Sequence, residues 1–314
     1  MAIYHMSIKT IGRNSGRSSV AAAAYRSAEK IYDHRTGLWH DFTGKGGVVH
    51  SEILLPEQAP AYYQDRAILW NAVEHSEKAK SARTAREIEI ALPAELGRAD
   101  HINLAREYAQ QFVDKGMCAD FAVHDKRDGN PHAHIILTTR PINPDGTWGA
   151  KSKKEYILDS RGQKMMLPSG EYKSRKVSAT DWDAKENAEL WREAWAKIVN
   201  RELERRGLEP VDHRSYKRQG LDREPTIHLG PKAAQMERQG IQTELGDHNR
   251  AVVQENAQRE RGRHIRNLEA KNFSQRDQTP EAERPSYDEW LAGYQKEKAR
   301  GQQKEQSRGH ERGR

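Results

Sequence analysis

The segment 119–140, which reads ADFAVHDKRDGNPHAHIILTTR, constrains the fold more than any other part of the chain. Two stretches rich in apolar, β-branched and aromatic residues flank a connection that contains the turn-forming sequence DGNP. This arrangement is typical of a β-hairpin. We therefore predict antiparallel strands at 121–124 and 132–138, joined by the loop 125–131.

Three of the chain's 14 histidines lie at the facing ends of these two strands. His124 is placed opposite His132, and opposed residues share a face with their Cβ atoms about 5 Å apart. His134 is two residues further along and points to the same face, whereas Ala133 and Ile135 point to the core. Three neutral imidazoles on a rigid hairpin can bind one divalent cation and leave coordination positions open. For this motif alone, the alternative is three surface histidines on a solvated hairpin.

The segment REIEIALP, residues 86–93, alternates strictly between polar and apolar positions and predicts a further strand. Ile88 and Ile90 belong to one face, so Glu87 and Glu89 share the other. If this strand belongs to the same sheet, a carboxylate could orient a metal-bound histidine or accept a proton. From this segment alone, a half-exposed strand with a solvated acidic face remains an equal alternative.

The remainder of the chain divides at about residue 230. Residues 1–230 alternate between strand-like and helix-like patterns, whereas residues 231–314 contain few large apolar side chains and are dominated by Gln, Glu, Arg and Lys. A stretch of that composition cannot bury a core, so we predict a polar tail that is helical or disordered. The other predicted elements are strands at 2–9 and 46–56, a loop at 142–155, and helices at 20–32, 61–78, 98–116 and 181–207.

Tyr25 follows four alanines in the predicted helix 20–32, for which Ser18 or Ser19 is a suitable N-cap. A phenol is a poor nucleophile until a base or a nearby positive charge favours the phenolate. The small alanine side chains would let another surface, such as a nucleic-acid backbone, come close. Tyr32 is seven residues further on and lies on nearly the same helical face. For both tyrosines the alternative is an ordinary packing role.

The composition narrows the class of protein. With 35% hydrophobic and 32% charged residues, the chain is expected to be soluble and unusually polar. It has no apolar run that approaches a membrane span, and its start lacks the apolar segment of a secretory leader. Cys118 is the single cysteine, which excludes an intramolecular disulfide and suits the reducing cytoplasm. The net charge of +7 favours an anionic partner, although the excess is modest.

Five stretches taken together resemble the MobA/MobL family of conjugative relaxases, which belong to the wider class of HUH endonucleases. These are MAIYHMSIKT followed by Tyr25, REIEIALPAEL, HDKRDGNPHAHIILTTRPI, DHRSYKRQGLDREPTIHLGPKAAQMERQG and LGDHNR, in that order. The resemblance covers about residues 1–250. The combination is highly specific, whereas the H-x-H motif alone would not be.

The resemblance implies an α+β fold with a central antiparallel sheet flanked by helices. Together with the change in composition near residue 230, it predicts a relaxase domain at 1–230 and a polar tail at 231–314. It implies that a tyrosine nicks one plasmid strand at an origin of transfer and becomes attached to the 5′ phosphate. The enzyme later rejoins the strand. Tyr25 matches that nucleophile, and His124, His132 and His134 match the metal ligands. One of Glu87 and Glu89 matches the acidic residue near the site. Tyr32 matches no family nucleophile, so we expect it to have a packing role.

The cofactor implied by the resemblance is one divalent metal ion, Mg²⁺ or Mn²⁺, although imidazole ligands also suit Zn²⁺ or Ni²⁺. The implied partners are single-stranded origin DNA, accessory relaxosome proteins and a coupling protein, in the cytoplasm and without stable membrane insertion. Six cations are placed to contact DNA phosphates, each with an ordinary solvated role as its alternative. They are Arg13, Arg17, Arg26, Arg214, Lys217 and Arg218.

Three other functions remain open from the sequence. A rolling-circle replication initiator would use the same histidine and tyrosine chemistry. A metal-dependent phosphohydrolase would use a metal-bound water and leave Tyr25 structural. A DNA-binding or scaffold protein would carry the histidines without catalysis. The first differs from a mobilisation protein in its DNA substrate, and the other two differ in whether Tyr25 becomes covalently attached to DNA.

Overall fold

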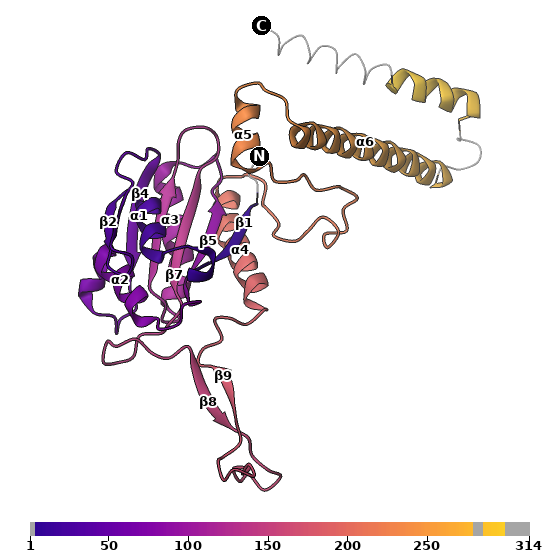
Figure 1. Ribbon diagram of the computed structural model, residues 1–314. Helices are drawn as coiled ribbons and strands as arrows, with labels where there is room; N and C mark the ends of the chain where they lie inside the picture. The colour runs from indigo at the N-terminus through magenta and orange to yellow at the C-terminus, as the bar shows by residue number, and fades with distance from the viewer. Residues whose placement is uncertain (1–3, 279–284, 299–314) are drawn as a thin grey trace. The chain divides into compact units, whose positions relative to one another are not determined.

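The computed structural model describes residues 4–278 and 285–298. They divide into two compact units, Met1–His213 and Arg214–Arg314. The first unit carries every strand that the described residues form, and the second consists of helices and extended segments (Figure 1). None of the helices in the described part of the chain combines the length and apolar composition that a membrane span needs.

The first unit is built on a five-stranded sheet in the order β1-β5-β7-β6-β4, in which every neighbouring pair is antiparallel. This confirms the α+β class and the central antiparallel sheet that the sequence predicts. The strands are β1 (Met6–Gly12), β4 (Val48–Leu54), β5 (Arg83–Ala91), β6 (Ala119–His124) and β7 (His132–Thr138).

The predicted hairpin forms in the predicted register. β6 pairs with β7 so that His124 lies opposite His132 and Ala122 lies opposite His134. The connecting loop reverses the chain through Gly129, whose φ of 80° lies in the left-handed region that glycine adopts without strain. β5 lies on the other side of β7 and places Glu89 opposite His134. The hairpin and a strand distant in sequence thus contribute to one patch of the sheet.

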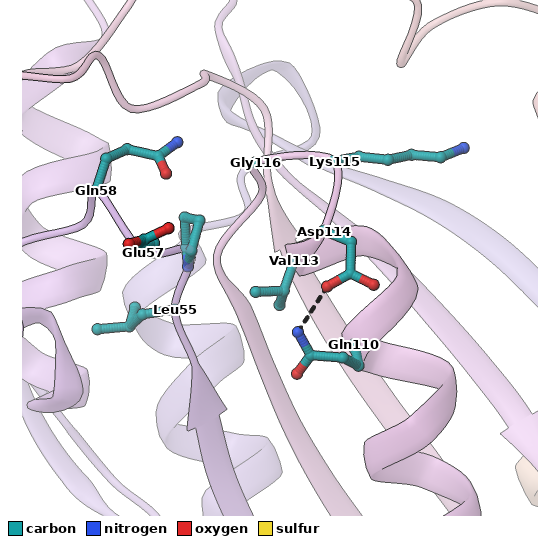
Figure 2. Close-up of a pocket in the computed structure, with 9 residues that line it drawn as sticks. Leu55, Glu57, Gln58, Gln110, Val113, Asp114, Lys115 and Gly116 are labelled. Carbon is teal, nitrogen blue, oxygen red and sulfur yellow. Dashed lines mark hydrogen bonds between the residues drawn. The ribbon is translucent and has the colours of Figure 1, made fainter.

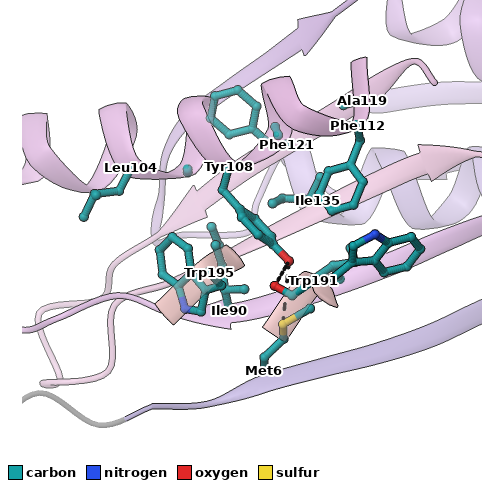
Figure 3. Close-up of a cluster of buried hydrophobic side chains, with 14 of the residues drawn as sticks. Met6, Ile90, Leu104, Tyr108, Phe112, Ala119, Phe121, Ile135, Trp191 and Trp195 are labelled. Atoms are coloured by element: carbon teal, nitrogen blue, oxygen red, sulfur yellow. Dashed lines mark hydrogen bonds between the residues drawn. The ribbon is translucent and has the colours of Figure 1, made fainter. Parts of the chain in front are cut away.

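Helices cover both faces of the sheet. α3 (Arg98–Val113) and α4 (Asn187–Arg205) pack on the face that carries Ile88, Ile90 and Ile135. Aromatic residues fill this core, and the Tyr108 hydroxyl donates to the Trp191 carbonyl at 3.0 Å (Figure 3). Each large apolar side chain that is fully buried here contributes about 1.5–3 kcal/mol to folding.

The opposite face carries a second core under α1 (Ser19–Ser27) and α2 (Arg66–Ser76), with Ile136 from β7 at its centre. His134 and Glu87 extend from this same face because strand residues alternate. The sheet therefore has an apolar face under α3 and α4, and a face under α1 and α2 on which apolar and ionisable side chains are mixed.

The helix predicted at 20–32 is too long. α1 ends at Ser27 because Ala28 adopts a left-handed φ of 59°, and its N–H caps the helix by donating to Ala24. The chain then forms β2 (Lys30–Asp33), which pairs with β3 (Leu38–Asp41). Tyr32 thus lies on a strand rather than on the helical face of Tyr25, and its ring packs against His34 and Trp39. The predicted N-cap is Ser18, which accepts from the Ala21 N–H.

Other boundaries also differ from the sequence-based prediction. The helix at 61–78 is interrupted at Asp65, whose carboxylate caps α2 by accepting from the Ile68 N–H. The loop at 142–155 includes most of β8 (Ser152–Tyr156), which pairs with β9 (Ser174–Ser178). The first strand begins at Met6 rather than at residue 2, and residues 1–3 lie outside the described range.

The second unit contains α5 (Gly230–Arg238) and α6 (Glu244–Gln278). Asn256 on α6 pairs with both backbone groups of Glu224, and Asn249 does the same with Ile227. These side-chain amides attach the extended segment before α5 to the long helix. The predicted tail is thus largely helical where it is described. A domain boundary at residue 230 stays a prediction, and tail residues 279–284 and 299–314 lie outside the described residues.

Candidate metal centre and nucleophile

The three hairpin histidines form one cluster at the edge of the hairpin loop. Their nearest ring nitrogens all lie within 4.8 Å of one another, and they are the sole group of three such ligands found among the described residues. The ring centroids are 4.8–5.2 Å apart. His124 and His134 are buried, whereas His132 is half-buried. His132 is therefore the most accessible of the three histidines.

Each imidazole has one ring nitrogen that is hydrogen-bonded within the protein. His124 Nε2 lies 2.7 Å from the Arg26 carbonyl, and His132 Nδ1 lies 2.9 Å from the Asn130 carbonyl. Because carbonyl oxygens only accept hydrogen bonds, both nitrogens must carry the proton. His134 Nδ1 lies 3.0 Å from the Glu87 carboxylate, which fixes its tautomer in the same way. The unprotonated nitrogens left over are His124 Nδ1, His132 Nε2 and His134 Nε2.

Burial keeps the cluster in the neutral form that metal binding requires. It lowers the pKa of His124 to about 3, and the neighbouring cation of Lys45 adds to this effect. Burial also lowers the pKa of His134, against the opposing effect of Glu87. Neutral imidazoles with a fixed second nitrogen are the usual arrangement of histidine metal ligands. The donor set therefore fits one divalent cation.

Glu87 is the carboxylate that contacts the cluster. Its side chain is 1% exposed, and Oε1 accepts from both His134 Nδ1 and the Arg26 guanidinium, the latter at 2.6 Å. Burial alone would raise the pKa of this group, but the hydrogen bond from His134 and the charge of Arg26 outweigh it and hold the pKa of Glu87 at about 2. A permanent negative charge thus lies behind His134, where it orients the ring and increases its basicity.

Glu89 has a different environment although it belongs to the same face of β5. It forms an ion pair with Lys9 at 2.8 Å, and its side chain is more exposed than that of Glu87. It lies opposite His134 in the strand register but makes no hydrogen bond to any of the three histidines in the described structure. The alternation of the strand places the two glutamates on one face, but their side chains contact different partners.

Tyr25 is connected to the cluster through its neighbour Arg26. The Arg26 carbonyl accepts from His124, and its guanidinium pairs with Glu87, so one residue contacts both the ligand shell and the carboxylate behind it. Tyr25 itself is 41% exposed and its ring packs edge-on against Phe42. The last turn of α1 therefore places an accessible phenol directly beside the residue that fixes the histidines.

The position of α1 is set by buried polar contacts at its first turn. The Glu74 carboxylate accepts from the backbone N–H and the hydroxyl of Ser19, at 2.9 and 2.7 Å. Ala23 and Ala24 are fully buried. Ala23 and Ala24 thus let the helix pack closely against its own protein, whereas Ala21 and Ala22 are only half-buried. Close approach of nucleic acid to these alanines stays a prediction. Contacts at both ends therefore fix the position of the helix that carries Tyr25.

The cations predicted to contact phosphates have different environments in the structure. Arg13 is engaged inside the protein, since its guanidinium bonds to the Glu74 carboxylate and to the backbone oxygens of Glu74, Glu77 and Ala79. Arg17 is exposed, and in the described residues its side chain makes no ion pair or hydrogen bond.

Arg26 is paired with Glu87 beside the site. Arg214, Lys217 and Arg218 are exposed and belong to the second unit. Phosphate contact by any of the six cations stays a prediction, and the internal bonds of Arg13 make it the weakest candidate among them.

Lys45 lies beside Tyr25 and was not anticipated from the sequence. Its ammonium group lies 4.0 Å from the centroid of the Tyr25 ring and donates to the Tyr25 carbonyl at 2.8 Å. The sequence signal is weak, because a lysine between glycines in the segment TGKGG reads as an ordinary turn.

A separate pocket of about 510 Å³ lies at the C-terminal end of α3, where Gln110 donates to Asp114 at 2.8 Å (Figure 2). None of the three histidines lines it, and neither Tyr25 nor Glu87 does. The pocket and the histidine cluster are therefore different features of the first unit.

Comparison with known proteins identifies the family. A family model described as MobA/MobL family matches residues 17–239, which is more than half of the chain. The chain belongs to the MobA/MobL family. The match includes Tyr25, both glutamates of β5 and all three histidines, so the whole candidate site lies within it.

Curated relatives agree with this assignment. The chain is 40% identical over 265 residues to "Mobilization protein MobL" of Acidithiobacillus ferridurans, which covers 76% of this chain and 64% of the relative. It is 37% identical over 273 residues to "Probable mobilization protein MobA" of Bifidobacterium longum (strain NCC 2705), which covers 82% of this chain and 48% of the relative. The chain thus spans about half to two thirds of the length of these relatives.

A solved structure described as "Molecular Basis of Vancomycin Resistance Transfer in Staphylococcus aureus" has the same fold. The match has a TM-score of 0.58 and 32% sequence identity, and it covers 68% of this chain and all of that chain. The fold described above is therefore one already found in a solved structure.

Proposed function

We propose that the chain is a metal-dependent relaxase that nicks one DNA strand through Tyr25 and later rejoins it. The observation that supports this most directly is the double contact of Arg26. The residue after the candidate nucleophile bonds both to a metal-ligand histidine and to the buried Glu87. Through these two contacts the last turn of α1, which carries Tyr25, is connected to His124 directly and to His134 through Glu87.

The proposed ligands of the cation are His124, His132 and His134, which leave open positions for substrate oxygens. When bound, a divalent cation would offset negative charge on the scissile phosphate. Glu87 holds the His134 ring in its tautomer, and the Arg26 carbonyl does the same for His124. Mg²⁺ and Mn²⁺ are the expected ions by family, although a site with three nitrogen ligands favours Mn²⁺ of the two.

In the proposed reaction the Tyr25 oxygen attacks phosphorus in line with the leaving 3′ oxygen. The phenolic oxygen–phosphorus bond forms, the bond from phosphorus to the 3′ oxygen breaks, and the proton lost by the phenol is balanced by one gained at the 3′-hydroxyl. The aryl phosphodiester conserves the energy of the broken bond. A 3′-hydroxyl can therefore displace Tyr25 later and reseal the strand without a nucleotide cofactor.

The proposed substrate is single-stranded DNA at a plasmid origin of transfer, because the relatives are named mobilization proteins. Accessory relaxosome proteins and a coupling protein are the proposed partners, in the cytoplasm. The net charge of +7 is consistent with a polyanionic substrate. The family match favours mobilisation over rolling-circle initiation, which shares the chemistry but not the family.

The test is a denaturing gel after incubation with single-stranded origin DNA and Mn²⁺. The wild-type protein should form a protein–DNA adduct that survives denaturation, and chelation of the metal should abolish it. Tyr25→Phe should abolish the adduct and leave Mn²⁺ binding intact, whereas Tyr32→Phe, the matched control on β2, should retain it. If Tyr25→Phe still cleaves the DNA and forms no adduct, the phosphohydrolase alternative is supported. The assignment of Tyr25 as the nucleophile is then wrong.

A further inference from the structure

The segment Phe42–Gly47 connects β3 to β4 and covers one side of Tyr25. The Phe42 ring meets the Tyr25 ring edge-on, with centroids 5.1 Å apart. Lys45 contacts Tyr25 twice, through the ring face at 4.0 Å and through a hydrogen bond to the backbone carbonyl at 2.8 Å. The candidate nucleophile is thus held by a loop that belongs to neither its own helix nor the histidine hairpin.

This loop is attached to the strand end that carries His124. The Asp125 N–H donates to the Gly47 carbonyl at 2.8 Å. Gly47 has a φ of 90°, and a Cβ at this position would meet Lys126 Cγ at 2.6 Å, so only glycine fits. Lys45 is therefore positioned by backbone that is joined to the metal-ligand hairpin.

The charge of Lys45 is not neutralised in the described structure. Two other cations near the site have carboxylate partners: Arg26 pairs with Glu87, and Lys9 pairs with Glu89. Lys45 is half-buried and forms no ion pair among the described residues. Burial and the cations of Arg26 and Lys126 lower its pKa to about 8. An unpaired ammonium in such a place is stabilised by an anion, and the anion expected beside Tyr25 is a phosphate.

We propose that Lys45 is a further residue of the strand-transfer site, which holds Tyr25 in place and donates a hydrogen bond to the phosphate that Tyr25 attacks. This inference rests on the proposed function. An ammonium group has three N–H donors and uses one on the Tyr25 carbonyl, so others remain for a phosphate oxygen. The same positive charge stabilises the phenolic oxygen when it attacks and when it later leaves.

The experiment compares Lys45→Met, Lys45→Arg and a matched control, Lys30→Met. Lys30 also places its ammonium over an aromatic ring, 5.4 Å from the Trp39 centroid, but it is paired with Asp41. The first readout is the single-turnover rate of adduct formation with saturating single-stranded origin DNA and Mn²⁺. Lys45→Met should slow it by about 10²-fold, the typical loss of one preorganised donor to a reacting oxyanion. Lys45→Arg should recover most of the rate, and Lys30→Met should match the wild type.

The second readout does not require turnover. The affinity for the same DNA is measured at several salt concentrations in the metal-free protein. Removal of one phosphate contact should reduce the slope of log affinity against log salt by about 0.7. A lysine that only supports the fold would leave this slope unchanged.

The outcomes distinguish the two proposals. If the wild type forms no adduct, the proposed relaxase function fails, whereas the salt slope still decides whether Lys45 binds a phosphate. If the wild type forms the adduct and Lys45→Met forms it at the same rate, the role of Lys45 is overturned. An unchanged salt slope, or an equal rate loss in Lys30→Met, would overturn it as well.

Discussion

Both faces of the central sheet bury side chains, but the two faces differ in what this burial achieves. Under α3 and α4, Ile88 and Ile135 meet other apolar side chains and need only shape complementarity. On the opposite face Glu87 and His134 are also buried, and they are tolerated because each is bonded to a partner. The comparison shows that the apolar face supplies stability, whereas the polar face uses some of that stability to hold ionisable groups in fixed protonation states.

The largest effect is expected from Glu87→Ala. This change leaves Arg26 and His134 Nδ1 in a buried site without their shared acceptor. Loss of one partner of a buried ion pair costs about 3–5 kcal/mol. Urea unfolding should show this loss, and the affinity for Mn²⁺ should fall as well because the His134 tautomer is no longer fixed. A stable Glu87→Ala protein with unchanged metal affinity would contradict the role given to this carboxylate.

A matched change on the apolar face is Ile135→Ala, one residue from His134 along β7 and on the opposite side. The cavity should cost about 2–5 kcal/mol in the free energy of unfolding. Because its side chain does not contact the cluster, the Mn²⁺ affinity of the folded protein should not change. Calorimetric titration well below the midpoint of unfolding measures this. A loss of metal affinity as large as that of Glu87→Ala would mean that the two faces are not independent.

Acidification should weaken the metal-free protein through the polar face. The pKa of His124 is about 3 in the folded chain and about 6.5 when unfolded, so the unfolded state binds more protons between these values. Stability should therefore fall as pH decreases below about 6.5, by at most about 1.4 kcal/mol per pH unit for each such histidine. Urea unfolding at several pH values measures the dependence. His124→Gln should reduce it, and a dependence that is the same in both proteins would show that His124 is not buried in the neutral form.

The smallest effect is expected from Glu89→Ala. Its partner Lys9 is about half exposed, and ion pairs of that kind contribute about 0–1 kcal/mol. The adduct yield and the Mn²⁺ affinity should stay close to those of the wild type. An effect as large as that of Glu87→Ala would assign the acidic role to Glu89 instead.

The part of the site that lies within one hairpin could be predicted from the sequence. Strand alternation and the loop length fix the pairing of His124 with His132 and the shared face of His134, and the structure confirms both. The two glutamates were placed on one face by the same reasoning. The different ion-pair partners of Glu87 and Glu89 could not be predicted, because they depend on which cation reaches each carboxylate from another element.

Contacts between distant segments account for what the sequence does not show. Glu74 fixes the start of α1 from a helix that is 55 residues away. It also binds Arg13, which was predicted to contact DNA phosphates because of its place in the loop before α1. Ala28 ends α1 in a left-handed conformation that an Ala-rich sequence does not indicate. The strands β8 and β9 are mostly exposed and polar, so they lack the apolar alternation by which the other strands are predicted.

The central claim is that the polar face holds one metal ion through three imidazole nitrogens whose tautomers the protein has already fixed. Calorimetric titration of the metal-free chain with Mn²⁺ tests this most directly. The wild type and Tyr25→Phe should each bind one equivalent at the same affinity, and His134→Ala should lose that binding while remaining folded. One equivalent bound with unchanged affinity by His134→Ala would contradict the claim.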